Sequence, residues 1–88
     1  MNNIELFLKK SKEIEKNYLE MLKQDVIYIK ENNINNISFI ERTLDNIMSI
    51  CFFDTHRLFF ELCNYYDDIN LENSNEYRLI YMDMHKND

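Results

Sequence analysis

Residues 47–66 read IMSICFFDTHRLFFELCNYY, and this stretch decides the fold that we expect for the chain. Thirteen of its twenty residues are apolar or aromatic, and it holds both cysteines and four of the six phenylalanines. At about 100° per residue on a helix, most of these side chains fall in one arc of roughly 160°. One neighbouring helix cannot cover an arc of this width. The stretch is therefore expected to form a helix that contacts at least two others.

The composition of the whole chain also favours helices. Its 88 residues include no Gly, Pro, Ala or Trp. Tight hairpin turns need residues that adopt positive φ or a preset φ, and here only Asn, present thirteen times, can replace Gly in that role. We therefore predict a single all-α domain over residues 1–88, close to the lower size limit for a chain that folds on its own core.

Three expected helix starts share the spacing Asn/Ser-x-x-Glu, which is typical of a capping box, and they lie at Asn2, Ser38 and Asn73. The apolar periodicity between them predicts helices over about residues 3–31, 39–69 and 74–85. A break in the second helix at Asp54 is an alternative, since Asp can cap a helix. The apolar stripe keeps its phase across Asp54, however, and this favours one continuous helix.

The expected architecture is an antiparallel hairpin of two long helices plus a short third helix, that is, a three-helix bundle. The third helix is too short to cover the whole hairpin. The half of the hairpin near the Asn-rich turn would then remain under-covered, with the apolar residues Val26, Ile29, Phe39, Ile40, Leu44 and Ile47. We therefore expect oligomerisation, in the simplest case a homodimer, to complete the core.

Charge is distributed unevenly along the chain, whose formal net charge is −6. Residues 1–36 carry six lysines and six acidic side chains, whereas residues 37–88 carry four basic and ten acidic ones. An acidic surface repels phosphates, so direct nucleic-acid binding is not expected. It suits a basic protein surface, and it leaves open an acidic mimic of nucleic acid or a solvated face that serves only solubility.

No motif of a known chemistry is present. Cys51, His56 and Cys63 point in different directions on a helix, which argues against a metal site, and Cys51 and Cys63 are about 18 Å apart along it, beyond disulfide reach. There is no nucleophile with a neighbouring histidine base and no Gly-rich phosphate loop. We expect no catalysis, cofactor or metal. Without a membrane-spanning stretch or a signal peptide, a cytoplasmic location is expected.

One face of the expected second helix stands out as a candidate protein-binding surface. It is turned away from the first helix and combines two phenylalanines in line with polar neighbours, which is the composition of interface anchors. Its residues are Ile50, Phe53, His56, Arg57, Phe60 and Asn64. The alternative is that the third helix or a second copy of the chain covers these residues and that they belong to the core.

These features together predict a small, acidic, non-catalytic protein that binds another protein. A regulator, adaptor or inhibitor fits this description, and the composition suggests a phage, plasmid or other mobile element, with antitoxin, immunity or anti-defence proteins as examples. Two alternatives remain. One is a structural or assembly subunit of a helical oligomer, and the other is an acidic nucleic-acid mimic that inhibits a DNA- or RNA-handling enzyme.

Overall fold

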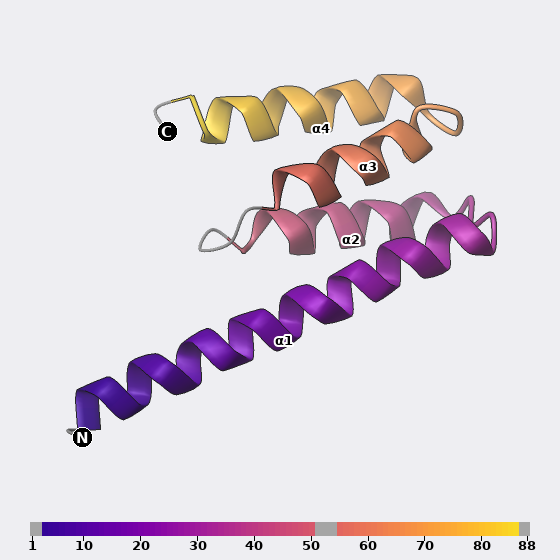
Figure 1. Ribbon diagram of the computed structural model, residues 1–88. Helices are drawn as coiled ribbons and strands as arrows, with labels where there is room; N and C mark the ends of the chain where they lie inside the picture. Colours follow the sequence, from indigo (N-terminus) through magenta and orange to yellow (C-terminus); the bar gives the residue numbers. More distant parts are fainter. Residues whose placement is uncertain (1–2, 51–54, 87–88) are drawn as a thin grey trace.

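The computed structural model describes residues 3–50 and 55–86, and over these residues the chain is all-helical. Figure 1 shows four helices stacked in chain order: α1 (Asn3–Glu31), α2 (Ile37–Met48), α3 (His56–Tyr66) and α4 (Leu71–Met84). The all-α prediction is confirmed. The predicted three-helix arrangement is wrong, because the described residues form four helices and the expected continuous helix over residues 39–69 is divided into α2 and α3.

The division begins at the C-terminal end of α2. The backbone N–H of Ser49 donates to the carbonyl of Asp45 at 3.1 Å, and its hydroxyl donates to the carbonyl of Asn46 at 2.6 Å. The chain re-enters a helix after Thr55, and α3 runs back along α2 (Figure 1). The possible break at Asp54 lies outside the described residues. Apolar periodicity over residues 39–69 is therefore compatible with two helices, because each of them buries an apolar face in the same core.

The turn between α1 and α2 shows how Asn replaces Gly in this chain. Asn33 has φ 51°, the left-handed conformation that commonly ends a helix. The N–H of the next residue, Ile34, donates to the carbonyl of Ile29 at 3.0 Å, as in a Schellman motif. Ile34 then packs against the core, and its own carbonyl accepts a hydrogen bond from the Tyr65 hydroxyl at 2.7 Å.

Asn also caps two helix starts, two or three residues before the predicted ones. The side chain of Asn36 accepts from the backbone N–H of Phe39 at 2.9 Å, and that of Asn70 accepts from the N–H of Asn73 at 3.0 Å. Each cap satisfies a donor that has no partner within the helix. As a result α2 begins at residue 37 and α4 at residue 71.

The core begins beside the Asn-rich turn and runs along α2, α3 and α4 and the C-terminal half of α1. Its buried apolar residues come from all four helices and from the end of α2: Leu19, Leu22, Val26, Ile29, Ile40, Leu44, Ile47, Ile50, Phe59, Leu62, Cys63, Tyr66 and Tyr81. The sequence-based expectation that the half of the hairpin near this turn is under-covered is therefore wrong. Because α3 folds back, it covers α1 and α2 there, where a continuous helix would have left them open.

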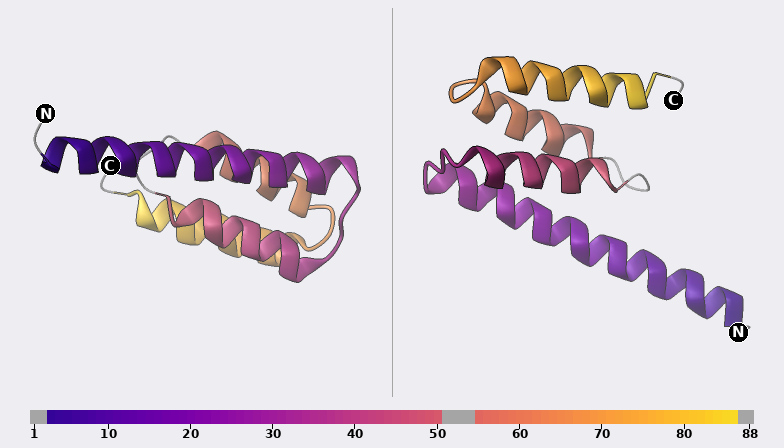
Figure 2. Two further views of the ribbon diagram at one scale, coloured as in Figure 1. Left: turned by 90° about the horizontal axis from the view of Figure 1, so that it is seen from below. Right: turned by 180° about the vertical axis from the view of Figure 1, so that it is seen from behind.

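The uncovered part of the molecule is instead the N-terminal half of α1. With 29 residues against 12 in α2, α1 extends more than 20 Å further at 1.5 Å per residue. Figure 2 shows this half leaving the other three helices. None of residues 3–17 is buried, and we call them the arm. No helix within the described ranges has the length and apolar character needed to cross a membrane.

Candidate functional site

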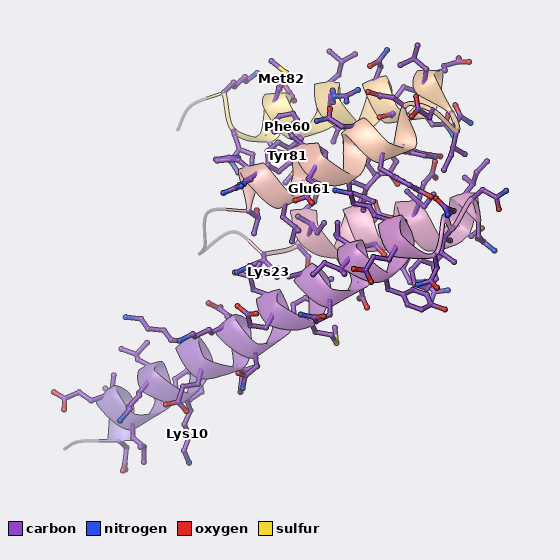
Figure 3. All side chains as sticks on the ribbon, turned by 45° about the vertical axis from the view of Figure 1, so that its right-hand side comes forward. Lys10, Lys23, Phe60, Glu61, Tyr81 and Met82 are labelled. Carbon is purple, nitrogen blue, oxygen red and sulfur yellow. The ribbon has the colours of Figure 1, made fainter. Side chains whose placement is uncertain are left out.

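The structure does not bring the five described residues of the predicted protein-binding surface together on one face. Ile50 follows α2 and is buried in the core, with 7% of its surface exposed. Phe60 is half-buried, and its ring packs edge-to-face on Tyr81 of α4 at 5.7 Å between centroids. Figure 3 shows these two side chains between α3 and α4. Phe53 lies outside the described residues.

His56 belongs to an aromatic cluster at the start of α3. Its Nδ1 lies 2.5 Å from the hydroxyl of Tyr81, and its ring meets that of His85 edge-to-face at 4.9 Å. Tyr81 also stacks on Phe59, with centroids 4.0 Å apart. The chain has only two histidines, and the fold places both against one buried tyrosine. This cluster holds the C-terminal end of α4 against the N-terminal end of α3.

The other two predicted residues, Asn64 and Arg57, lie in different places. The side-chain oxygen of Asn64 accepts from Nη2 of Arg78 at 2.8 Å, so Asn64 takes part in the α3–α4 contact. Arg57 is exposed and lines a groove between α1 and α3. The described members of the predicted surface thus divide among the core, the α3–α4 contact and the groove. Their role in binding a protein stays a prediction.

Arg78 is the main polar link between α3 and α4. Its two terminal nitrogens donate to the two carboxylate oxygens of Asp67, at 2.6 and 2.8 Å. Such paired geometry is the strong form of an arginine–carboxylate contact, and these hydrogen bonds hold the pKa of Asp67 below its usual range. Below this pair, the hydroxyl of Ser74 donates to the carbonyl of Cys63 at 2.9 Å. These polar groups at the α3–α4 contact thus have hydrogen-bond partners across it.

Arg78→Ala is expected to lower the free energy of unfolding by about 1.5–3 kcal/mol, because hydrogen bonds to a partly buried carboxylate are lost. Urea unfolding at neutral pH measures this change. Arg42→Ala, at an exposed arginine of α2, should stay within about 0.5 kcal/mol of the unmodified protein. The Asp67 contribution depends on its carboxylate charge, so the difference between the two variants should shrink as the pH falls through the lowered pKa of Asp67. Equal losses in both variants at neutral pH would contradict this role for Arg78.

Two tyrosines connect α2 to the other helices. The hydroxyl of Tyr66 donates to a carboxylate oxygen of Glu41 at 2.5 Å, and the amide of Asn73 donates to the same oxygen at 3.0 Å. The hydroxyl of Tyr77 donates to Asp45 at 3.0 Å. Burial, and then the adjacent carboxylate, raise the pKa of Tyr66 to about 12 and that of Tyr77 still further. These contacts stabilise the fold by joining α2 to α3 and α4.

A groove of about 440 Å³ lies between α1 and α3. Its apolar lining comes from Leu19, Val26, Ile27 and Leu58, and its charged lining from Lys23, Arg57 and Glu61. Glu61 is paired with Lys30 at 2.8 Å, and Lys23 with Glu20 at 3.2 Å. Both ion pairs are exposed and contribute little stability. The groove is open to solvent and lies at the point where the arm leaves the bundle.

The arm continues the core-facing stripe of α1 beyond the bundle. At 100° per residue, Ile4, Phe7, Leu8 and Ile14 lie on or beside the face that carries Leu22 and Val26 further along the helix. In the bundle this face is buried, whereas in the arm the exposed fractions are 69% for Ile4, 68% for Phe7, 53% for Leu8 and 68% for Ile14. Apolar side chains gathered on one uncovered helix face are typical of a contact surface.

The arm also differs from the rest of the chain in charge. It carries four lysines and three glutamates, whereas the remainder of the chain carries six basic and thirteen acidic residues. Lys10 projects from the arm well away from the bundle (Figure 3). The arm was not predicted from the sequence, because a continuous helix over residues 39–69 would have been long enough to run beside it. A helix of about 12 residues cannot cover one of 29, and this length difference is the signal that locates the arm.

Cys63 is buried as a free thiol, and burial raises its pKa to about 11, so it is a weak nucleophile. No group of three or more His, Cys, Asp or Glu residues within residues 3–50 and 55–86 is placed to hold a metal ion. No family model, curated protein or solved structure matches the chain.

Proposed function

We propose that this protein is a small non-catalytic regulator, adaptor or inhibitor that binds another protein chain, and that the arm is its binding element. The observation that carries the proposal is the uncovered apolar face of residues 3–17, which none of α2, α3 or α4 reaches (Figure 2). A single helix face that presents apolar anchors at helical spacing is a common mode of protein recognition.

The energetics favour a partner for this face. Burial of a side chain such as Phe7 or Ile4 contributes about 1.5–3 kcal/mol, and in the free chain each of these remains more than half exposed. An isolated helix of this length is marginal in water, so the apolar face rather than helix propensity would hold the arm in a complex. Binding would therefore bury the face and order the arm together.

Photo-crosslinking from the arm tests this proposal. A photoreactive amino acid at Phe7 is expected to capture a defined protein chain in the cells that make the protein. The same amino acid at Arg42, exposed on α2, serves as the control and should not capture that chain. The captured chain is then purified and its affinity for the protein measured by calorimetry. Phe7→Asp with Leu8→Asp should weaken binding by at least about a hundredfold, because two apolar anchors are lost.

The double variant also provides its own folding control. Both residues lie outside the bundle, so the urea midpoint of the variant should match that of the unmodified protein. Capture from Arg42 as strong as from Phe7, or unchanged affinity in the double variant, would overturn the proposal.

A second candidate function is that of an assembly subunit, whose partner is its own chain. The specific observation in its favour is a second uncovered apolar surface, on the outer side of α4. Leu71, Leu79 and Met82 there are 57%, 68% and 59% exposed. Such a subunit would also be non-catalytic.

A further inference from the structure

The outer side of α4 combines apolar and acidic residues. Leu71, Leu79 and Met82 fall within about 80° of one another on the helix, and Figure 3 shows Met82 on the side of α4 away from α3. The side chains of Glu72, Glu76 and Asp83 border this stripe along one edge, within about 40° of one another. All six are exposed. The opposite side of α4, with Ser74 and Tyr81, is buried against α3.

The arm has the complementary pattern. Its apolar stripe, defined by Ile4, Phe7 and Leu8, is bordered along one edge by Glu5 near the N-terminus and by Lys12 and Lys16 further along. Seen from the N-terminus of its own helix, the charged edge lies on the same side of the apolar stripe in the arm and in α4. When two such helices pack stripe against stripe in antiparallel orientation, these two edges meet. With residues 3–17 laid along residues 71–84, this orientation places Lys12 beside Glu76 and Lys16 beside Glu72, whereas Glu5 lies beside Asp83 at the other end. The lengths also agree, since 15 residues of the arm and 14 of α4 each span about 21–23 Å.

From these matches we propose that the arm binds a second copy of this chain, on the outer side of its α4. The proposal rests on the proposed function, because it names the partner of the arm. The contact has to form between copies: α1 and α4 lie at opposite ends of the stack (Figure 1), and α4 packs on α3 with its outer side turned away from α1. Each copy offers one arm and one α4, so the contact joins different surfaces and can repeat into rings or chains.

The strength of one such contact is modest. Two single helices bury less surface than the roughly 1,200–2,000 Å² of a standard interface. Association is therefore expected at tens to hundreds of micromolar rather than in the nanomolar range. Sedimentation equilibrium over about 10–500 µM covers this range, and it should show a reversible increase in average mass.

Charge reversal on each surface tests which residues meet. The arm variant is Lys12→Glu with Lys16→Glu, and the α4 variant is Glu72→Lys with Glu76→Lys. Each variant alone brings like charges together and should associate at least about tenfold more weakly. In an equimolar mixture, the acidic arm of the arm variant can bind the basic α4 of the α4 variant, and the basic arm of the α4 variant can bind the acidic α4 of the arm variant. Both pairings join opposite charges, so the mixture should associate as the unmodified protein does. A control with the same change in net charge, Lys10→Glu with Arg42→Glu, should associate as the unmodified protein does.

Four results would overturn the inference. They are a protein that stays monomeric up to 500 µM, an α4 variant that associates normally, a mixture that does not recover, and a control that loses association like the arm variant. Circular dichroism of every variant ensures that lost association does not reflect lost helix. If self-association fails while crosslinking from Phe7 captures a different protein, the inference is wrong and the proposed function stands. If crosslinking captures only copies of this chain, the inference holds and the function of an assembly subunit replaces that of a regulator of another protein.

Discussion

Tyr81→Ala is expected to lower the free energy of unfolding by about 3–5 kcal/mol, the usual cost of removing a large buried aromatic side chain. Tyr81 is 2% exposed, stacks on Phe59 with centroids 4.0 Å apart, and places its hydroxyl 2.5 Å from Nδ1 of His56. An 88-residue domain has only about 4–13 kcal/mol of stability in total. The variant should therefore lie close to its unfolding transition at 25 °C, with a large loss of helical circular dichroism in low urea.

Tyr28→Ala is the matched control for this experiment. Tyr28 lies on α1, is 53% exposed, and makes one tilted ring contact with Phe39 at 6.3 Å. The same substitution there should cost less than about 1 kcal/mol. If the two alanine variants unfold at similar urea concentrations, α4 is not packed on α3 as the structure places it.

Tyr81→Phe separates the hydroxyl from the ring. It keeps the stacking on Phe59 and removes the hydrogen bond to His56, so the expected loss is about 0.5–1.5 kcal/mol. A loss as large as that of the alanine variant would mean that the hydroxyl, rather than ring packing, holds the α3–α4 contact. The loss of stability should therefore increase from Tyr28→Ala through Tyr81→Phe to Tyr81→Ala. One series of urea curves then compares an exposed ring, a buried hydrogen bond and a buried ring.

The fold class can be predicted from the sequence because turn formation depends on the residues of the turn itself. A chain without Gly or Pro has few ways to make tight turns, and Asn33 adopts the left-handed conformation that Gly would otherwise supply. The sequence fails at residues 48–56 because its signal there is ambiguous. Apolar periodicity reports which face of a segment is buried, but α2 and α3 both bury apolar faces against the same core, so it does not show where one helix ends and the next begins. Where the chain reverses between them is a question of tertiary packing.

The error in helix number explains why the described residues of the predicted binding surface do not share one face. On a continuous helix, Ile50 and Phe60 lie outside the arc that two neighbours cover, whereas in the folded chain Ile50 is in the core and Phe60 packs on Tyr81. The alternative interpretation of these residues as core fits both positions. Arg57 alone among the described members faces an open groove. The arm was missed because its exposure depends on how far α2 and α3 reach, which periodicity cannot tell.

Raising the pH from 9 to 12 is expected to remove about 5 kcal/mol of stability, enough to unfold the protein. Two groups in the core carry this effect. Burial raises the pKa of the Cys63 thiol from 9.0 to about 11 and that of Tyr66 from 10.0 to about 12, the latter helped by its hydrogen bond to Glu41. Both side chains are fully buried, so ionisation in the folded state would place a charge in the core.

The sign follows from proton binding. Between the unfolded and folded pKa values, the unfolded chain has released its proton and the folded chain has kept it, so stability falls as pH rises. Each group costs about 1.4 kcal/mol per pH unit within its window. Cys63 acts from pH 9 to 11 and Tyr66 from pH 10 to 12, which makes the loss steepest between pH 10 and 11. The raised pKa of Tyr77 acts in the same direction.

Urea unfolding at pH 8 to 12, followed by circular dichroism, measures this profile, and two variants assign it. Cys63→Ala should flatten the loss between pH 9 and 11, and Tyr66→Phe should flatten it between pH 10 and 12. Tyr66→Phe leaves Glu41 with the amide donor of Asn73 at 3.0 Å, so its cost at pH 8 should stay near 1 kcal/mol. A variant less stable than the unmodified protein at pH 8 should thus become the more stable of the two by pH 12. Parallel profiles for all three proteins would show that neither buried group carries the alkaline transition.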